Sequence, residues 1–175
     1  MEARAKLFGH PVHQMLVVFP LGLLATSVIF DVVGLISGGA TWPTVAYWTM
    51  AAGIVGAVVA APFGLIDFLA IPHGTRARRI GAMHGGGNAV VSVLFLGSWL
   101  LRRPQQSPDE VALALSFGGA AIALLTAWLG GELVSRLGVG VSDGAGLDAS
   151  NSMHHDSGAG RHADPDGRRV RYAGR

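Results

Sequence analysis

The sequence has no cysteine and unusually little charge. Without cysteine, disulfides, thiolate catalysis, cysteine-ligated iron–sulfur clusters and cysteine zinc sites are excluded. Charged residues make up only 14% of the 175 residues, whereas soluble domains carry about 25%. Hydrophobic residues make up 50%, and the remaining soft or borderline metal ligands are seven histidines and five methionines. This balance indicates an integral membrane protein whose natural partner is the lipid bilayer.

The apolar residues fall in four long runs. At about 1.5 Å per helical residue, each run is long enough to cross a hydrocarbon core of about 30 Å. We therefore expect an all-α membrane protein, a four-transmembrane-helix bundle, with helices at about residues 15–36, 45–71, 82–101 and 111–134. The first run exceeds the about 7–15 apolar residues of a signal peptide, so we interpret it as a retained helix. Pro20 is predicted to kink that helix.

The composition changes abruptly near residue 138. Residues 1–137 hold all four runs and are predicted to form the transmembrane domain. Residues 138–175 are rich in glycine, aspartate, serine, arginine and histidine, with almost no large apolar side chains. Such a segment cannot bury a core, so a disordered polar tail is expected.

Small residues form two faces on the second predicted helix, and such faces let membrane helices approach closely or associate as homo-oligomers. The two faces are Gly53, Ala57 and Ala61, and Gly56, Ala60 and Gly64. We find no convincing internal repeat. Pro20 with Asp31 faintly echoes Pro62 with Asp67, but the spacing differs.

The placement of arginine and lysine predicts the orientation. On one side of the membrane lie Arg4 and Lys6, the three arginines of residues 72–81, and the arginines that follow the last helix. The other side has only Arg102 and Arg103. The positive-inside rule therefore places both termini in the cytoplasm, in a multi-pass protein of the inner or plasma membrane.

Polar side chains from three predicted helices gather at that cytoplasmic end. Ionisable groups within membrane spans are rare and usually face the bundle interior or water. Asp31 is the exception, because its position in the first helix places it toward the outer face. The candidate cofactor-binding residues are His13, His84, His10, Asp67 and Asn88.

Several chemistries fit these residues. His13 and His84 on facing helices would ligate the iron of a b-type haem, with Asp67 near enough to orient one ring. The same groups could instead hold a transition metal, with Asp67 as a ligand or as a residue that orients one. Proton relay to a quinone or ion, in a transporter subunit, is a further alternative. In another, the histidines cap helices in a cofactor-free structural or accessory protein. No GxSxG, P-loop or HExxH motif indicates an enzyme, and the tail arginines lack the interleaved aromatics of nucleic-acid binders.

Several motifs are spread along the chain. They are Gly9-His10-Pro11-Val12-His13, Phe19-Pro20-Leu21-Gly22, Phe30-Asp31-Val32-Val33-Gly34, Gly64-Leu65-Ile66-Asp67, His84-x-x-x-Asn88, Gly130-Gly131-Glu132-Leu133-Val134 and Gly138-Val139-Gly140-Val141. Over about residues 8–141 this set resembles the motifs of the domain-of-unknown-function family 2231. The resemblance implies a four-helix membrane protein of bacteria or archaea. Some members are fused to Rieske-type iron–sulfur domains, which implies a redox setting and a redox partner. Glu132 stands where many members have histidine, which argues against a ligand there.

Overall fold

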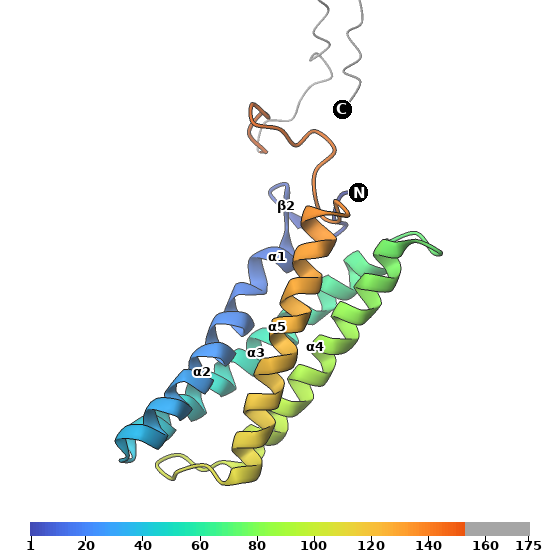
Figure 1. Cartoon of the computed structure of the whole chain (residues 1–175). Coiled ribbons are helices and arrows are strands. Elements are labelled where there is room, and N and C mark those ends of the chain that lie inside the picture. The colour runs from blue at the N-terminus through green and yellow to red at the C-terminus, as the bar shows by residue number, and fades with distance from the viewer. Residues whose placement is uncertain (153–175) are drawn as a thin grey trace, which may run out of the picture.

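The computed structural model describes residues 1–152, and within them the chain forms a bundle of long helices (Figure 1). This confirms the predicted fold class. The part of the tail prediction that concerns residues 153–175 lies outside the described residues. A short antiparallel hairpin precedes the helices. The elements are β1 (Lys6–Leu7), β2 (His10–Pro11), α1 (Val12–Leu16), α2 (Val18–Ser37), α3 (Thr41–Leu69), α4 (Arg76–Leu101) and α5 (Glu110–Ser135).

The two ends of the bundle differ in what they carry. We call the end with the N-terminus, the loop of residues 70–75 and the last turn of α5 the terminal end (Figure 1). The opposite end, with the α2–α3 and α4–α5 loops, is the distal end. Helices α2 and α4 both begin at the terminal end, whereas α3 and α5 return to it.

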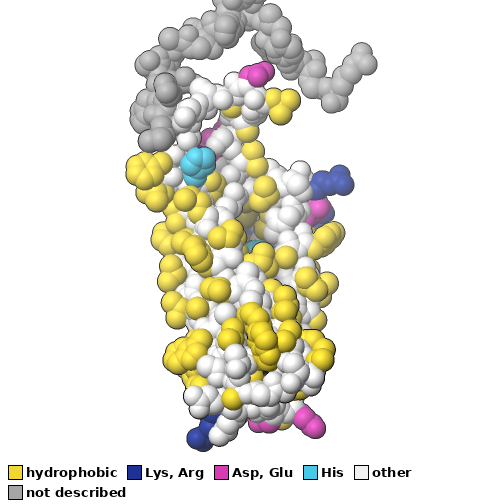
Figure 2. Space-filling view, turned by 90° about the vertical axis from the view of Figure 1, so that its left-hand side faces the viewer, with side chains coloured by type: hydrophobic (Ala, Val, Ile, Leu, Met, Phe, Trp, Pro, Cys, Tyr) yellow, Lys and Arg dark blue, Asp and Glu magenta, His cyan; other side chains and the backbone are white. Residues whose placement is uncertain are grey.

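Within the described residues, four helical segments are long and apolar enough to cross a membrane, each of 26–29 residues. Exposed apolar side chains cover the flank of the bundle, and charged ones gather toward its ends (Figure 2). Leu124 is 74% exposed and Trp128 is 67% exposed. Such a belt of apolar side chains is suited to contact with lipid tails. The helices also satisfy their own backbone polar groups, as the hydrocarbon region requires.

The helices begin and end at local signals that shift the predicted bounds. Helix α4 begins six residues before the predicted position, because the Thr75 hydroxyl accepts a hydrogen bond from the Arg78 amide and caps it. The first predicted span is interrupted at Val17, between α1 and α2. Pro20 lacks an amide hydrogen and cannot donate to the carbonyl of Leu16, the residue at which α1 ends.

The helices pack first as two hairpins, α2 against α3 and α4 against α5. Small residues of α3 make the first contact close. A Cβ atom at Gly53 would lie 2.7 Å from the Leu24 side chain, and one at Gly56 would lie 3.1 Å from Pro20. Gly53 belongs to one predicted small-residue face, and Gly56 belongs with Gly64 to the other, so both faces make contacts inside their own hairpin.

The buried core lies in the middle of the bundle, between the two polar ends. It consists of one side chain from α2, one from α3 and two from α4, which are Leu24, Met50, Val91 and Phe95. Trp99 and Ile122 pack against this cluster from the sides. An apolar layer thus separates the polar residues of the terminal end from those of the distal end.

Candidate functional site

His13 lies on α1 and points toward α3. Its Nδ1 atom is 3.1 Å from the main-chain carbonyl oxygen of Ala60. The ring lies over Gly64, where an added Cβ atom would be only 2.8 Å from a ring carbon. The imidazole is half-buried, and the glycine provides the space that it fills.

His84 makes the matching arrangement in the other hairpin. Its Nδ1 atom is 2.8 Å from the carbonyl oxygen of Thr126, and its ring lies over Gly130, where a Cβ atom would be 3.0 Å away. The Asn88 amide nitrogen is 3.2 Å from Nε2. The Thr126 hydroxyl lies 3.0 Å from the Asn88 amide oxygen, to which it donates. This network fixes the ring.

These contacts determine the tautomer of each ring in its neutral form. A carbonyl oxygen only accepts, so Nδ1 of His13 and of His84 must carry the hydrogen and donate it. In the neutral rings Nε2 then holds a lone pair, which can take a proton or a metal ion. The structure thus brings the two predicted histidines to one end in the same tautomer.

Asp67 does not orient a histidine, and that prediction is wrong. Its Oδ1 atom accepts the main-chain amides of Arg4 at 2.7 Å and Ala5 at 3.1 Å. The histidine Nδ1 atoms instead pair with main-chain carbonyls. Asp67 therefore fastens the N-terminal segment to the end of α3.

Two further polar residues lie at the rim of the terminal end. His10 is exposed in β2, with Nε2 at 3.2 Å from the Ser152 hydroxyl. Glu132 near the end of α5 pairs with Arg76 at the start of α4, at 2.6 Å. Between residues 1 and 152, no group of three or more histidine or acidic side chains is arranged to hold a metal ion.

Contacts with the N-terminus continue past the predicted domain boundary at residue 137. The Met1 ammonium donates to the carbonyl of Gly138 at 2.9 Å, and the Gly140 amide donates to the carbonyl of Met1 at 2.9 Å. The first residues of the predicted polar tail are therefore hydrogen-bonded to the transmembrane part. The composition change does not coincide with the end of the structured contacts.

Glu2 connects the same two segments. Its carboxylate accepts from the Lys6 ammonium and, at 3.2 Å, from the Asp143 amide. The hydrogen bond from Lys6 is the main reason that the pKa of Glu2 lies below its usual value, and the Asp143 amide adds to it. Glu2 is thus kept ionised at the surface of the terminal end.

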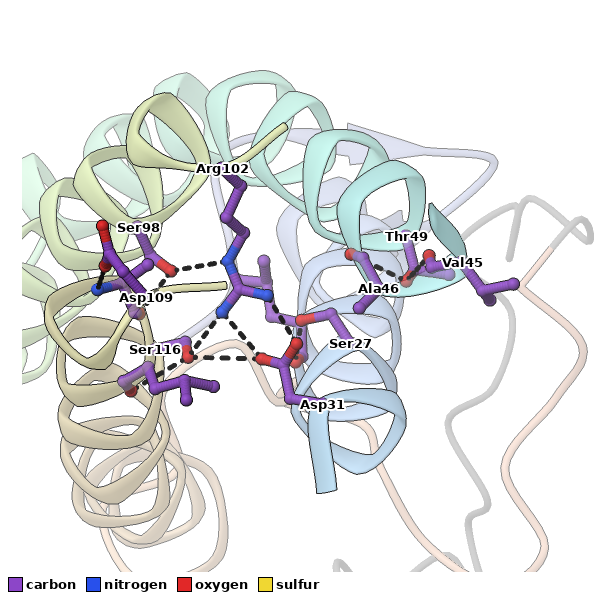
Figure 3. Close-up of polar contacts among 12 residues, drawn as sticks. Ser27, Asp31, Val45, Ala46, Thr49, Ser98, Arg102, Asp109 and Ser116 are labelled. Atoms are coloured by element: carbon purple, nitrogen blue, oxygen red, sulfur yellow. Dashed lines mark hydrogen bonds and ion pairs between the residues drawn. The ribbon is translucent and has the colours of Figure 1, made fainter. Parts of the chain in front are cut away.

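The distal end holds an ion pair that the sequence interpretation missed (Figure 3). Asp31 and Arg102 face each other through two parallel hydrogen bonds of 2.5 and 2.7 Å. The guanidinium also donates to the hydroxyls of Ser98 at 3.1 Å and Ser116 at 3.0 Å. The two charged side chains are 0% and 2% exposed. Such a fork-to-fork pair has its lone pairs and hydrogens satisfied, as burial requires.

One signal in the sequence pointed to this pair. An isolated carboxylate in a membrane span needs a partner, and Arg102 ends the third predicted span at the same side of the membrane. A hollow of about 210 Å³ opens beside Asp31, between α2 and the loop before α5. Because both carboxylate oxygens already face Arg102, we assign no ligand to this hollow.

Comparison with known families adds one finding. The family model described as "Predicted membrane protein (DUF2231)" matches residues 9–143, which include every long helix and both His13 and His84. No curated protein and no solved structure matches the chain.

Proposed function

Because the chain belongs to the DUF2231 family of predicted membrane proteins, we propose a function for it within the bilayer: redox-linked binding of b-type haem through His13 and His84. The observation that carries the proposal is the shared hydrogen bond from Nδ1 to a main-chain carbonyl. This bond orients each ring and leaves Nε2 as the ligand atom, which is the usual arrangement of metal-bound histidine. Neutral imidazole is a suitable axial ligand for haem iron.

The surroundings of His84 favour the approach of a flat ligand. Gly85 and Gly86 follow it on α4, and a Cβ atom at either position would meet nothing within 4 Å. The Asn88 amide nitrogen lies 3.2 Å from Nε2 of His84 and donates to the main-chain carbonyl of His84 at 2.9 Å. Haem b, when bound, would supply one-electron transfer. The chain's own part is to hold two neutral imidazoles at one end of the bundle, where the helices shield them from water.

An absorption spectrum tests the proposal. The full chain, produced in haem-replete cells and purified in detergent, should show a Soret band and contain about one iron per chain. Because both imidazoles would hold the haem iron, His13→Ala and His84→Ala should each abolish or strongly shift that band. His73→Ala is the matched control, since His73 is exposed in the loop before α4. A colourless, iron-free preparation would exclude haem binding.

A cofactor-free role is the second candidate, and one observation favours it. The rings of His13 and His84 themselves fill the space over Gly64 and Gly130. In that case the histidines join the helices of each hairpin. Their substitution by alanine would lower the unfolding temperature and leave a featureless visible spectrum, because each change frees a buried carbonyl.

We also propose that the terminal end faces the cytoplasm. Asp31 neutralises Arg102 at the distal end, whereas Arg76, Arg78 and Arg79 cluster at the terminal end. Arginine and lysine are therefore more numerous at the terminal end, and the positive-inside rule counts these residues rather than the net charge. Single cysteines at Thr41 and His73 test this in intact cells with an impermeant thiol reagent. We expect labelling at Thr41 only, and labelling at His73 alone would reverse the orientation.

A further inference from the structure

The buried residues of α2 and α4 follow one pattern. In α2 they are Pro20, Leu24, Ser27 and Asp31. Each of these four residues has a buried counterpart 71 positions later in the sequence, in α4 or at its C-terminal cap. One of the four pairs is Asp31 and Arg102, which are hydrogen-bonded to each other. The four counterparts are Val91, Phe95, Ser98 and Arg102. His13 and His84 have the same separation.

The return helices α3 and α5 follow a second constant separation, of 66 positions. The buried residues of α3 that obey it are Ala46, Met50, Gly53 and Ala60. Their counterparts in α5 are Ala112, Ser116, Gly119 and Thr126, and all four are buried. The two separations differ by five, because Ala46 stands 15 positions after Asp31 whereas Ala112 stands 10 positions after Arg102.

The contacts repeat as well as the burial. His13 pairs with the carbonyl of Ala60, and its counterpart His84 pairs with the carbonyl of Thr126. Each ring lies over the glycine four residues beyond that carbonyl. In the centre, a Cβ atom at Gly53 would be 2.7 Å from Leu24, and one at Gly119 would be 2.9 Å from Phe95. Three independent contacts thus connect equivalent positions.

We infer that the bundle is a pair of equivalent helical hairpins, α1–α3 and α4–α5, which meet across a pseudo-twofold axis and are directed to pair with each other by Asp31 and Arg102. Helices α2 and α4 run in the same direction (Figure 1), so the axis lies along the bundle. The interfaces agree with this relation, because α3 packs on α4 and α2 packs on α5. The inference stands independently of haem binding.

The charged pair lies where equivalent positions of the two hairpins meet (Figure 3). If a hairpin paired with a copy of itself, two aspartates or two arginines would face each other in a buried site. Opposite charges at positions 31 and 102 therefore favour the mixed pair and oppose both self-pairs. The surface that each hairpin buries therefore fits the other hairpin of the same chain.

Exchange of equivalent residues tests the inference in the full chain. Ser116 supports Arg102 by a hydrogen bond, and its counterpart in the first hairpin is Met50. In the natural background, M50S/S116M should lower the Tm in detergent, because the arginine loses its partner. In the background D31R/R102D, the same two changes should raise the Tm, because the serine introduced at position 50 would then support the arginine introduced at position 31. This reversal of sign is expected only for equivalent hairpins, and a fall in both backgrounds would overturn the inference.

A second exchange avoids charged residues and serves if the charge-exchanged chain fails to fold. Leu24 and Phe95 are equivalent and belong to the same core cluster. L24F alone should lower the Tm, because the ring would clash at Gly53, and F95L alone should lower it by leaving a cavity. The exchange L24F/F95L conserves volume and should recover most of the loss. Simple addition of the two losses would contradict the inference.

Discussion

The terminal and distal ends of the bundle treat their polar residues in different ways. At the terminal end, His13 and His84 pair with main-chain carbonyls inside their own hairpins. At the distal end, Asp31 and Arg102 are charged and pair across the two hairpins. Buried polarity therefore has two uses in this molecule. The carboxylate and guanidinium of the distal pair join the hairpins, and their hydrogen bonds are used within the pair and its serine neighbours. The histidine rings of the terminal end retain Nε2 lone pairs that can bind a ligand.

The largest loss of stability should come from removing one charge at the distal end. Arg102→Ala would leave the buried Asp31 carboxylate without its partner and should lower the free energy of unfolding by about 3–5 kcal/mol. Denaturant unfolding in detergent micelles measures it. Arg103→Ala is the matched control, since Arg103 is exposed and its loss should change stability by no more than about 0.5 kcal/mol. Equal effects of the two substitutions would mean that the pair does not join the hairpins.

A smaller loss of stability is expected at the terminal end, where the contacts are those of histidine rings packed over glycines. Gly130→Ala would place a Cβ atom 3.0 Å from the His84 ring and should reduce stability by about 1–3 kcal/mol. Gly131→Ala is the control next to it, because nothing lies within 4 Å and alanine favours helix by about 1 kcal/mol. Gly64→Ala should resemble Gly130→Ala, since a Cβ atom there would meet the His13 ring at 2.8 Å. If Gly64→Ala stabilised the protein, the two histidine contacts would not be alike.

The fold could be predicted because long apolar runs have few alternatives in lipid, where backbone groups must be satisfied within each segment. Bounds were less predictable, because they depend on single contacts. Thr75 starts α4 by a capping hydrogen bond, and the arginines after it looked like loop residues in the sequence. Composition also placed the end of the structured part too early, since two glycines beyond residue 137 pair with Met1.

The candidate site could be predicted only in part. His13 and His84 were identifiable, because a polar side chain near a span end is conspicuous and topology brings such ends together. Their partners were not, because main-chain carbonyls such as those of Ala60 and Thr126 leave no trace in the residue types. Asp67 looked like a better partner by charge, but the amides of the N-terminal segment reach it first.

The equivalence of the hairpins was hidden for a related reason. Equivalent positions share burial and contacts but often differ in residue type, as Leu24 and Phe95 or Met50 and Ser116 do. The faint echo between Pro20 and Pro62 compares α2 with α3, whereas the real correspondence runs from α2 to α4. Spacing between buried residues carries the repeat, and burial is visible only in the folded chain.

The separation between Asp31 and Arg102 also has a consequence during synthesis. Arg102 emerges 71 residues after Asp31, which is roughly 4–14 s at a translation rate of about 5–20 residues per second. Since α3 ends at Leu69, the first hairpin is complete for the last 33 residues of that interval while the Asp31 carboxylate still has no guanidinium partner. Since Asp31 lies toward the distal end of α2, the side chain can stay hydrated at the membrane surface until α4 arrives. The second hairpin then supplies the missing guanidinium. The position of Asp31 near the distal end of α2 therefore allows the first hairpin to insert before the second.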